Sequence, residues 1–216
     1  MAGEPLTTGT VFDVRASERT RPASARITMP VSEFQDAALY GEDVRYEVFN
    51  DLVVLCPATS PAERGPNGEL EYLLRAYRDH HPLGGILDDT LADQELVTPS
   101  GLRRPDRVIW TELGRTPQIE FDPPSIVVEF VSITTVDRRR EFETKRNEYG
   151  QLGVAEYWIL DRFRRMMVVC RGDVVAAVVP EDGTYETPLL PGFSLPFRDL
   201  LKYADRYDPP ASPDPA

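Results

Sequence analysis

Residues 125–131 read SIVVEFV, and this short stretch decides the architecture of the chain. Apart from the leading serine, every position is apolar except Glu129, so both faces of an extended strand would be apolar. A strand of this kind is typical of the middle of a sheet that is covered on both sides. Glu129 would then be buried, and a buried carboxylate costs several kcal/mol unless it is protonated, paired or bound to a metal. The sequence therefore predicts a partner for Glu129, either an arginine or a metal ion.

A helix predicted over residues 138–152, and ended by Gly153, carries a second unusual side chain. Lys145, one of only two lysines in the chain, lies on the apolar stripe of this helix, whose other members are Phe142, Tyr149 and Leu152. A lysine side chain on the core side of a helix either extends until its ammonium group reaches water at the edge of the helix or meets a negative partner inside the protein. The second interpretation would place Lys145 against Glu129 and Asp106.

Asp106 follows Pro105 at the start of a strand predicted over residues 106–111. Alone, such an aspartate often only caps a turn. Together with Glu129 and Lys145, however, it supplies the parts of a magnesium site that cuts phosphodiester bonds. Two carboxylates hold a hard cation, and a lysine orients the attacking water or offsets charge on the phosphate. Chemistry of this type needs no histidine.

The composition excludes several other classes of protein. The two histidines are the adjacent pair His80 and His81, which cannot build a multi-histidine metal cage, and the two cysteines, Cys56 and Cys170, cannot form a four-cysteine zinc site or a disulfide framework. No lysine follows a glycine as a Walker loop requires, and no GxGxxG motif follows a strand. No signal peptide or membrane span is visible, so we expect a cytoplasmic protein without membrane contact.

The remaining pattern predicts an α/β fold, with a mixed sheet flanked by helices, in one domain over residues 26–206. Residues 1–25 and the proline-rich residues 207–216 are expected to be flexible tails. We predict a hairpin of residues 44–49 and 52–56, a loop over 58–68, and helices over 31–40 and 69–79. Further strands are predicted near Ile86 and over 95–97, 106–111, 125–131, 154–160, 166–171 and 174–179.

Several pieces of the sequence, in this order, resemble the Uma2 family of restriction-endonuclease-like proteins. They are YEVFNDLVVL at residues 46–55, PD at 105–106, IVVEFVS at 126–132, ETKRNEYGQLGV at 143–154 and EYWILD at 156–161. The resemblance covers roughly residues 28–203, and the combination from Pro105 to Asp161 is specific although each piece alone is not. It implies the PD-(D/E)XK nuclease fold.

The resemblance also implies roles for individual residues. Asp106 and Glu129 would bind the metal, Mg²⁺ or alternatively Mn²⁺, Lys145 would be the catalytic lysine, and Glu47 would be a supporting acidic residue. In the plain D-(D/E)XK pattern the lysine stands two positions after the acid, where this chain has Val131. Lys145 must therefore reach the site from the following helix.

The charge of the chain bears on its partners. The net charge is −12, which opposes binding to nucleic acid, but residues 101–171 hold 13 basic and 11 acidic side chains. Arginines at 103, 104, 107 and 138–140 could surround the site entrance. The leading hypothesis is a magnesium-dependent nuclease, with DNA favoured over RNA. The alternatives are a non-catalytic nucleic-acid-binding or regulatory protein with the same fold, or a hydrolase of a smaller phosphate compound.

An apolar run near the C-terminal half predicts self-association. The stretches MMVVC and VVAAVV, at residues 166–170 and 174–179, would leave a long apolar edge or face on a monomer. Such surfaces are usually covered. We therefore expect a homodimer.

Overall fold

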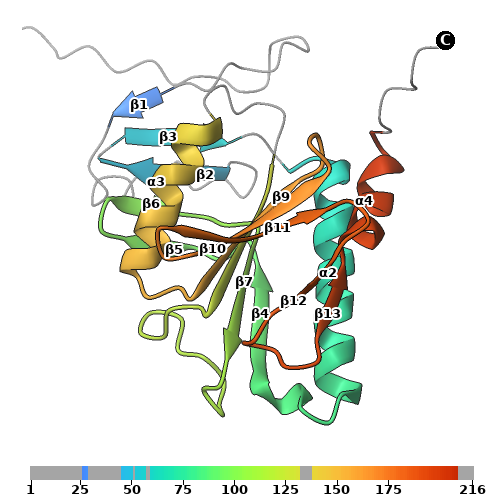
Figure 1. The fold of residues 1–216 in the computed structure, drawn as a ribbon. Helices are drawn as coiled ribbons and strands as arrows, with labels where there is room; N and C mark the ends of the chain where they lie inside the picture. Colours follow the sequence, from blue (N-terminus) through green and yellow to red (C-terminus); the bar gives the residue numbers. More distant parts are fainter. Residues whose placement is uncertain (1–25, 29–44, 51, 57–58, 132–137, 209–216) are drawn as a thin grey trace, which may run out of the picture.

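The computed structural model describes residues 26–28, 45–50, 52–56, 59–131 and 138–208. Figure 1 shows a larger and a smaller sheet with helices α2, α3 and α4 packed around them. The larger sheet has six strands in the order β11-β10-β9-β8-β7-β4. Their bounds are β4 Leu87–Ala92, β7 Arg107–Thr111, β8 Ile126–Phe130, β9 Glu156–Asp161, β10 Met166–Arg171 and β11 Val174–Pro180.

Only one pair of neighbours in this sheet is parallel. Strands β8 and β9 run parallel, while the other four pairs are antiparallel. A parallel pair needs a crossover connection, and here it contains α3 (Arg138–Gln151). Gly153, with φ of 87°, follows the end of this helix as the sequence predicts.

Helices cover both faces of the six-stranded sheet. Helices α2 (Pro61–His80) and α4 (Phe197–Asp205) pack on one face, where Leu70, Leu74, Leu200 and Leu201 join the largest core cluster. Helix α3 lies on the other face (Figure 1), where Tyr149 packs with Val108, Trp110, Val127 and Tyr157. Strand β8 is thus covered on both sides, as its apolar sequence predicts. The predicted mixed sheet flanked by helices is confirmed.

A second sheet lies beside α3 and has five strands in the order β1-β3-β2-β6-β5. It contains β1 (Arg26–Thr28), β2 (Arg45–Phe49), β3 (Leu52–Cys56), β5 (Leu96–Thr98) and β6 (Gly101–Arg103). The hairpin predicted near residues 44–56 corresponds to β2 and β3, which pair from Arg45↔Cys56 to Phe49↔Leu52. A short hairpin of β12 (Thr184–Glu186) and β13 (Ser194–Pro196) completes the sheets of the described residues.

The predicted loop over residues 58–68 is wrong for most of its length, because helix α2 already begins at Pro61. Proline is favoured in the first helical turn, and the carboxylate of Glu63 accepts a hydrogen bond from the Ser60 backbone at 2.8 Å. Gly65 lies where α2 meets α4, since an added Cβ would stand 3.2 Å from the Tyr203 carbonyl oxygen. Packing between the helices therefore overrides the weak helix propensity of this segment.

Other differences are smaller. The strand expected near Ile86 is instead a 3₁₀ turn, η1 (Gly84–Ile86), followed by β4. The sequence also did not indicate helix α4. The predicted helix over 31–40, the N-terminal tail and most of the C-terminal tail lie outside the described residues. Within the described part of the chain, none of the helices combines the length and the apolar character that crossing a bilayer requires.

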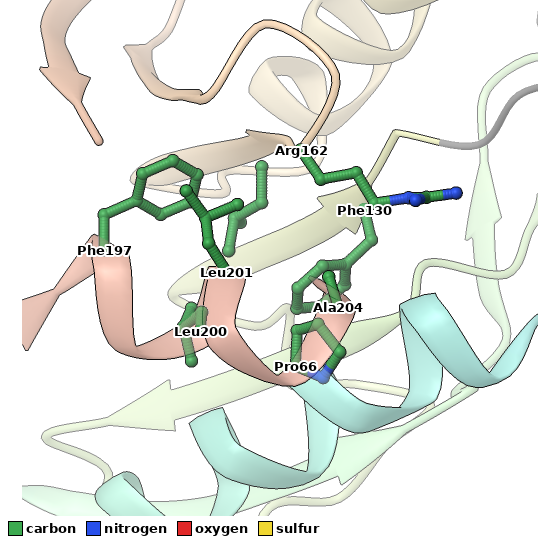
Figure 2. A pocket seen from close by; sticks show the side chains of 8 residues that line it. Pro66, Phe130, Arg162, Phe197, Leu200, Leu201 and Ala204 are labelled. Carbon is green, nitrogen blue, oxygen red and sulfur yellow. The ribbon is translucent and has the colours of Figure 1, made fainter. Parts of the chain in front are cut away.

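A small apolar cavity lies between α4, α2 and β8 (Figure 2). Its lining includes Pro66, Phe130, Phe197 and Leu201, and the guanidinium of Arg162 points away from it. The cavity has a volume of about 10 Å³, which leaves room for about one water molecule at most. It is a gap in the packing and not a substrate site.

Candidate metal-dependent active site

Asp106 and Glu129 stand opposite each other on neighbouring strands. Strands β7 and β8 pair antiparallel with Arg107 opposite Val128, so the preceding residue Asp106 lies across from Glu129. Directly opposed residues point to the same face of a sheet, and here it is the face that α3 covers. The Asp106 carboxylate also accepts a hydrogen bond from the Phe130 backbone at 2.7 Å, which ties it to β8. The structure thus brings together two carboxylates that are 23 positions apart.

Lys145 reaches this face from α3, and its side chain is buried. Its Nζ lies 3.0 Å from Glu129 Oε1 and 3.0 Å from Glu47 Oε1, a residue of β2. Lys145 is only 5% exposed, so it does not extend to the rim of the helix. The alternative in which an arginine pairs with Glu129 is also wrong, because the basic partner is this lysine.

A clamp around Arg103 connects Glu47 to helix α3. Arg103 Nη1 lies 3.0 Å from the second oxygen of Glu47, and its Nε lies 2.6 Å from Glu148 Oε2. The Ser100 hydroxyl donates to the other Glu148 oxygen. Arg103, Glu47 and Glu148 are all buried. The clamp therefore fixes the five-stranded sheet, which carries Glu47 and Arg103, to the helix that carries Lys145.

Tyr149 is a further polar neighbour of Glu129. Its hydroxyl donates to Glu129 Oε1 at 2.9 Å, and its side chain is fully buried. The sequence pattern identified Tyr149 only as an apolar core residue, because periodicity reports the ring and not the hydroxyl. Glu148 was likewise not identified, and Arg103 was expected at the site entrance and not as the partner of Glu47 and Glu148. The spacing of Glu148, one helical turn after Lys145, is the one local signal for it.

Burial and neighbouring charges shift the pKa values of these groups in opposite directions. Burial alone would raise the pKa of Glu47, but Lys145 and Arg103 outweigh it and hold that pKa below its ordinary value. Burial raises the pKa of Glu129, and the nearby carboxylates of Asp106 and Glu47 add to this rise against the opposing effect of Lys145. Burial and the charge of Glu129 raise the pKa of Tyr149 well above 10, so its hydroxyl keeps its proton.

The arginines expected around the entrance lie elsewhere. Arg103 is buried in the clamp, Arg104 pairs with Glu95 at 3.0 Å, and Arg107 is buried beneath α2, where it pairs with Glu71 at 2.9 Å. Asn67 of α2 accepts a bond from Arg107 and donates one to the Asp106 carbonyl. These arginines stabilise the scaffold and do not present a free basic surface. The side chains at 138–140 lie outside the described residues.

The donor set suits one class of metal. Among the described residues, no three histidine, cysteine or acidic side chains form a ready metal cage. Mg²⁺ does not need one, because it commonly binds through one or two carboxylates and completes its shell with waters and substrate phosphates. Asp106 and Glu129 provide two carboxylates on one face. The buried group also contains more acids than bases, with Asp106, Glu129, Glu47 and Glu148 against Lys145 and Arg103, which a divalent cation would offset.

Comparisons with known proteins identify the family and the fold. The model of the Uma2 family, described as "Putative restriction endonuclease", matches residues 31–198. Five solved chains match the fold. One is the crystal structure of a "putative nuclease belonging to DUF820" from Anabaena variabilis, with a TM-score of 0.66 and 16% identity over 82% of this chain and 99% of that one. No curated protein sequence matches the chain.

Proposed function

Because this chain belongs to the Uma2 family, we propose that it is a nuclease that uses a divalent metal ion to hydrolyse phosphodiester bonds, with DNA as its substrate. The observation that carries the proposal is the meeting of Asp106, Glu129 and Lys145 on one buried face. Two opposed carboxylates with a lysine beside them match the needs of phosphodiester hydrolysis. The family model is itself described as "Putative restriction endonuclease", which agrees with this proposal.

In this proposal Asp106 and Glu129 hold the metal, Mg²⁺ or Mn²⁺. The bound ion would polarise the phosphate and lower the pKa of a water molecule. The Asp106 carboxylate is already fixed by the Phe130 backbone. Glu129 is held by Lys145. The two ligands are thus held in place before any ion binds, which reduces the reorganisation that binding requires.

Lys145 would hold the positive charge that faces the scissile phosphate. Its ammonium either orients the attacking water or offsets charge that develops on the phosphate oxygens. Glu47 would hold Lys145 in place, since one of its oxygens contacts Nζ and the other contacts Arg103. With both oxygens engaged, Glu47 acts as a supporting acid.

A non-catalytic protein that binds nucleic acid or regulates another protein is the second candidate. It is favoured by the net charge of −12 and by the engagement of Arg103, Arg104 and Arg107 in ion pairs within the chain. Phosphate contacts from basic side chains supply most of the non-specific affinity for DNA. A protein with this charge would therefore bind duplex DNA weakly unless a metal bridges the two.

A metal titration with one matched pair of variants separates the two candidates. Asp106→Asn removes a ligand charge but keeps an oxygen that can accept the Phe130 bond, while Asp199→Asn removes a surface charge paired with Lys202. We expect the wild type and the Asp199 variant to bind Mn²⁺ and cleave DNA with Mg²⁺, and the Asp106 variant to do neither. Metal binding without cleavage of DNA or RNA, or no binding by the wild type, would favour the non-catalytic candidate.

We also propose that the chain forms a homodimer through β11. This strand pairs with β10 on one side, and no described strand pairs with its other edge. Val174, Val175 and Val178 are about half exposed or more, at 61%, 49% and 53%. An open edge without charged residues is a template for pairing with a second strand.

A further inference from the structure

The hydroxyl of Tyr149 has no part in the scheme above, although it contacts the proposed metal ligand directly. It donates to Glu129 Oε1 at 2.9 Å, and Lys145 Nζ donates to the same oxygen at 3.0 Å. Within the described part of the chain, no residue hydrogen-bonds to the other oxygen, Oε2. The two donors therefore hold one oxygen of the carboxylate and leave the other available to a cation.

The surroundings of Tyr149 fix this hydroxyl firmly. Its side chain is fully buried, and its ring meets Tyr157 edge-on with the ring centroids 5.1 Å apart. Tyr149 follows Lys145 by four positions, so both side chains leave the same face of α3. They differ in charge. The lysine offsets the negative charge of Glu129, whereas the neutral phenol restrains the carboxylate and leaves its charge for a metal.

We infer that Tyr149 is a positioning residue for metal binding, whose hydroxyl holds Glu129 in the orientation that presents Oε2 to a divalent ion. The inference rests on the proposed function, because it takes Glu129 as a metal ligand. Groups that orient a ligand without touching the metal typically change the metal affinity by about 10- to 100-fold when they are removed. Tyr149→Phe removes only the hydroxyl and keeps the ring packed on Tyr157.

The chain offers a matched control on the opposite face of the sheet. Tyr185 is also buried, and its hydroxyl donates to the buried carboxylate of Glu156 at 3.0 Å. Its ring packs on Trp158 in the core beneath α2 and α4. Tyr185→Phe therefore removes the same chemical bond, a phenol to a buried glutamate, where no metal is proposed.

The experiment compares the full-length wild type, Tyr149→Phe and Tyr185→Phe. Mn²⁺ binding is measured by isothermal titration calorimetry, and DNA cleavage is measured over a range of Mg²⁺ concentrations. We expect Tyr149→Phe to bind Mn²⁺ about 10-fold more weakly and to need a correspondingly higher Mg²⁺ concentration, with cleavage recovering at saturation. Tyr185→Phe should keep the wild-type affinity even if its melting temperature falls.

Each other outcome overturns the inference. Wild-type Mn²⁺ affinity in Tyr149→Phe overturns it and leaves the proposed function standing. Equal loss of affinity in both variants, or a Tyr149→Phe protein that is unfolded at the assay temperature, assigns the hydroxyl to stability alone. A wild type that binds no Mn²⁺ removes the proposed function and this inference together.

Discussion

At the scale of single residues, Lys145 is the side chain that matters both to the structure and to the proposed catalysis. Its ammonium is shared by Glu129 and Glu47, both buried. Lys145→Met keeps the volume of the stem and removes the charge. We expect cleavage to fall by at least ~100-fold, the scale of one positioned electrostatic group, while the melting temperature with magnesium stays within a few degrees because the cation replaces the lost positive charge.

The other lysine provides the control for this variant. Lys202 on α4 is largely exposed and pairs with Asp199 on the surface. Lys202→Met should therefore leave cleavage at the wild-type rate. Cleavage that persists in Lys145→Met would remove Lys145 from the mechanism. If that variant instead unfolds even with magnesium, Lys145 serves structure, and the stranded carboxylates account for a loss on the order of 3 to 5 kcal/mol.

Glu47 gives a prediction about pH. Because its pKa is lower in the folded protein than its ordinary value of 4.5, its ionised form contributes stability that is complete above pH 4.5 and is lost as the pH falls through the folded pKa. We expect Glu47→Gln to cost on the order of 3 kcal/mol near pH 7. This difference from the wild type should shrink steadily below pH 4.5, as measured by urea unfolding without metal.

A surface pair calibrates the Glu47 measurement. Glu181 contacts Arg165 at 2.6 Å but is 38% exposed, so Glu181→Gln should cost less than about 1 kcal/mol. A Glu47 variant that is no less stable than this control would show that the Arg103 clamp does not stabilise the fold.

The sequence predicted part of this site and missed the rest for a physical reason. Glu129, Asp106 and Lys145 are conspicuous because each places a charge where a local pattern calls for an apolar or turn residue. Arg103 and Glu148 are not conspicuous in this way. An arginine in a polar stretch has the same sequence pattern whether its side chain faces water or a carboxylate 45 positions away. Their partners exist only in three dimensions.

At the scale of secondary-structure elements, Gly101 controls how β6 joins β2. Its φ is 145°, and an added Cβ would stand 2.3 Å from the Val48 carbonyl oxygen. Gly101→Ala should therefore force β6 away from β2, on which Glu47 lies, at a cost of roughly 2 kcal/mol or more. Gly68 in α2 has open space around it, so Gly68→Ala should instead stabilise the protein by up to about 1 kcal/mol. Thermal unfolding of the two variants gives the comparison, and equal melting temperatures would contradict it.

The elements that the sequence predicted well are those with a strong local signal. The β-branched runs of β8, β10 and β11 and the hairpin of β2 and β3 were placed within a residue or two. The first half of α2 was missed because Gly65, Pro66 and Gly68 argue against a helix that α4 and a proline start nevertheless stabilise. Strand β4, with the sequence LDDTLA, was missed because its two adjacent aspartates interrupt the alternation of apolar and polar residues that identifies a strand.

At the scale of the whole molecule, the open edge of β11 predicts a dimer. Val178→Lys places a charge at the edge of β11 where the second chain would pair, so this variant should be monomeric. Because one chain has a mass of 24.3 kDa, light scattering should report ~24 kDa for the variant and twice that mass for the wild type. Val97 is 74% exposed on the other sheet, and Val97→Lys should leave the dimer intact. A wild type that is monomeric across a wide concentration range would reject the dimer.

The attachment of α3 has a consequence for how the protein opens. Helices α2 and α4 bury leucines, whereas the buried side chains among the described residues of α3 are Lys145, Glu148 and Tyr149. Strand β8 lies in the middle of the six-stranded sheet, and β7 has a paired strand on each side. Amide hydrogen exchange should therefore find β8 exchanging only through global unfolding and α3 through a local opening of lower free energy. Such an opening withdraws Lys145 from carboxylates that stay in place, so warming should abolish the proposed DNA cleavage before the sheet melts.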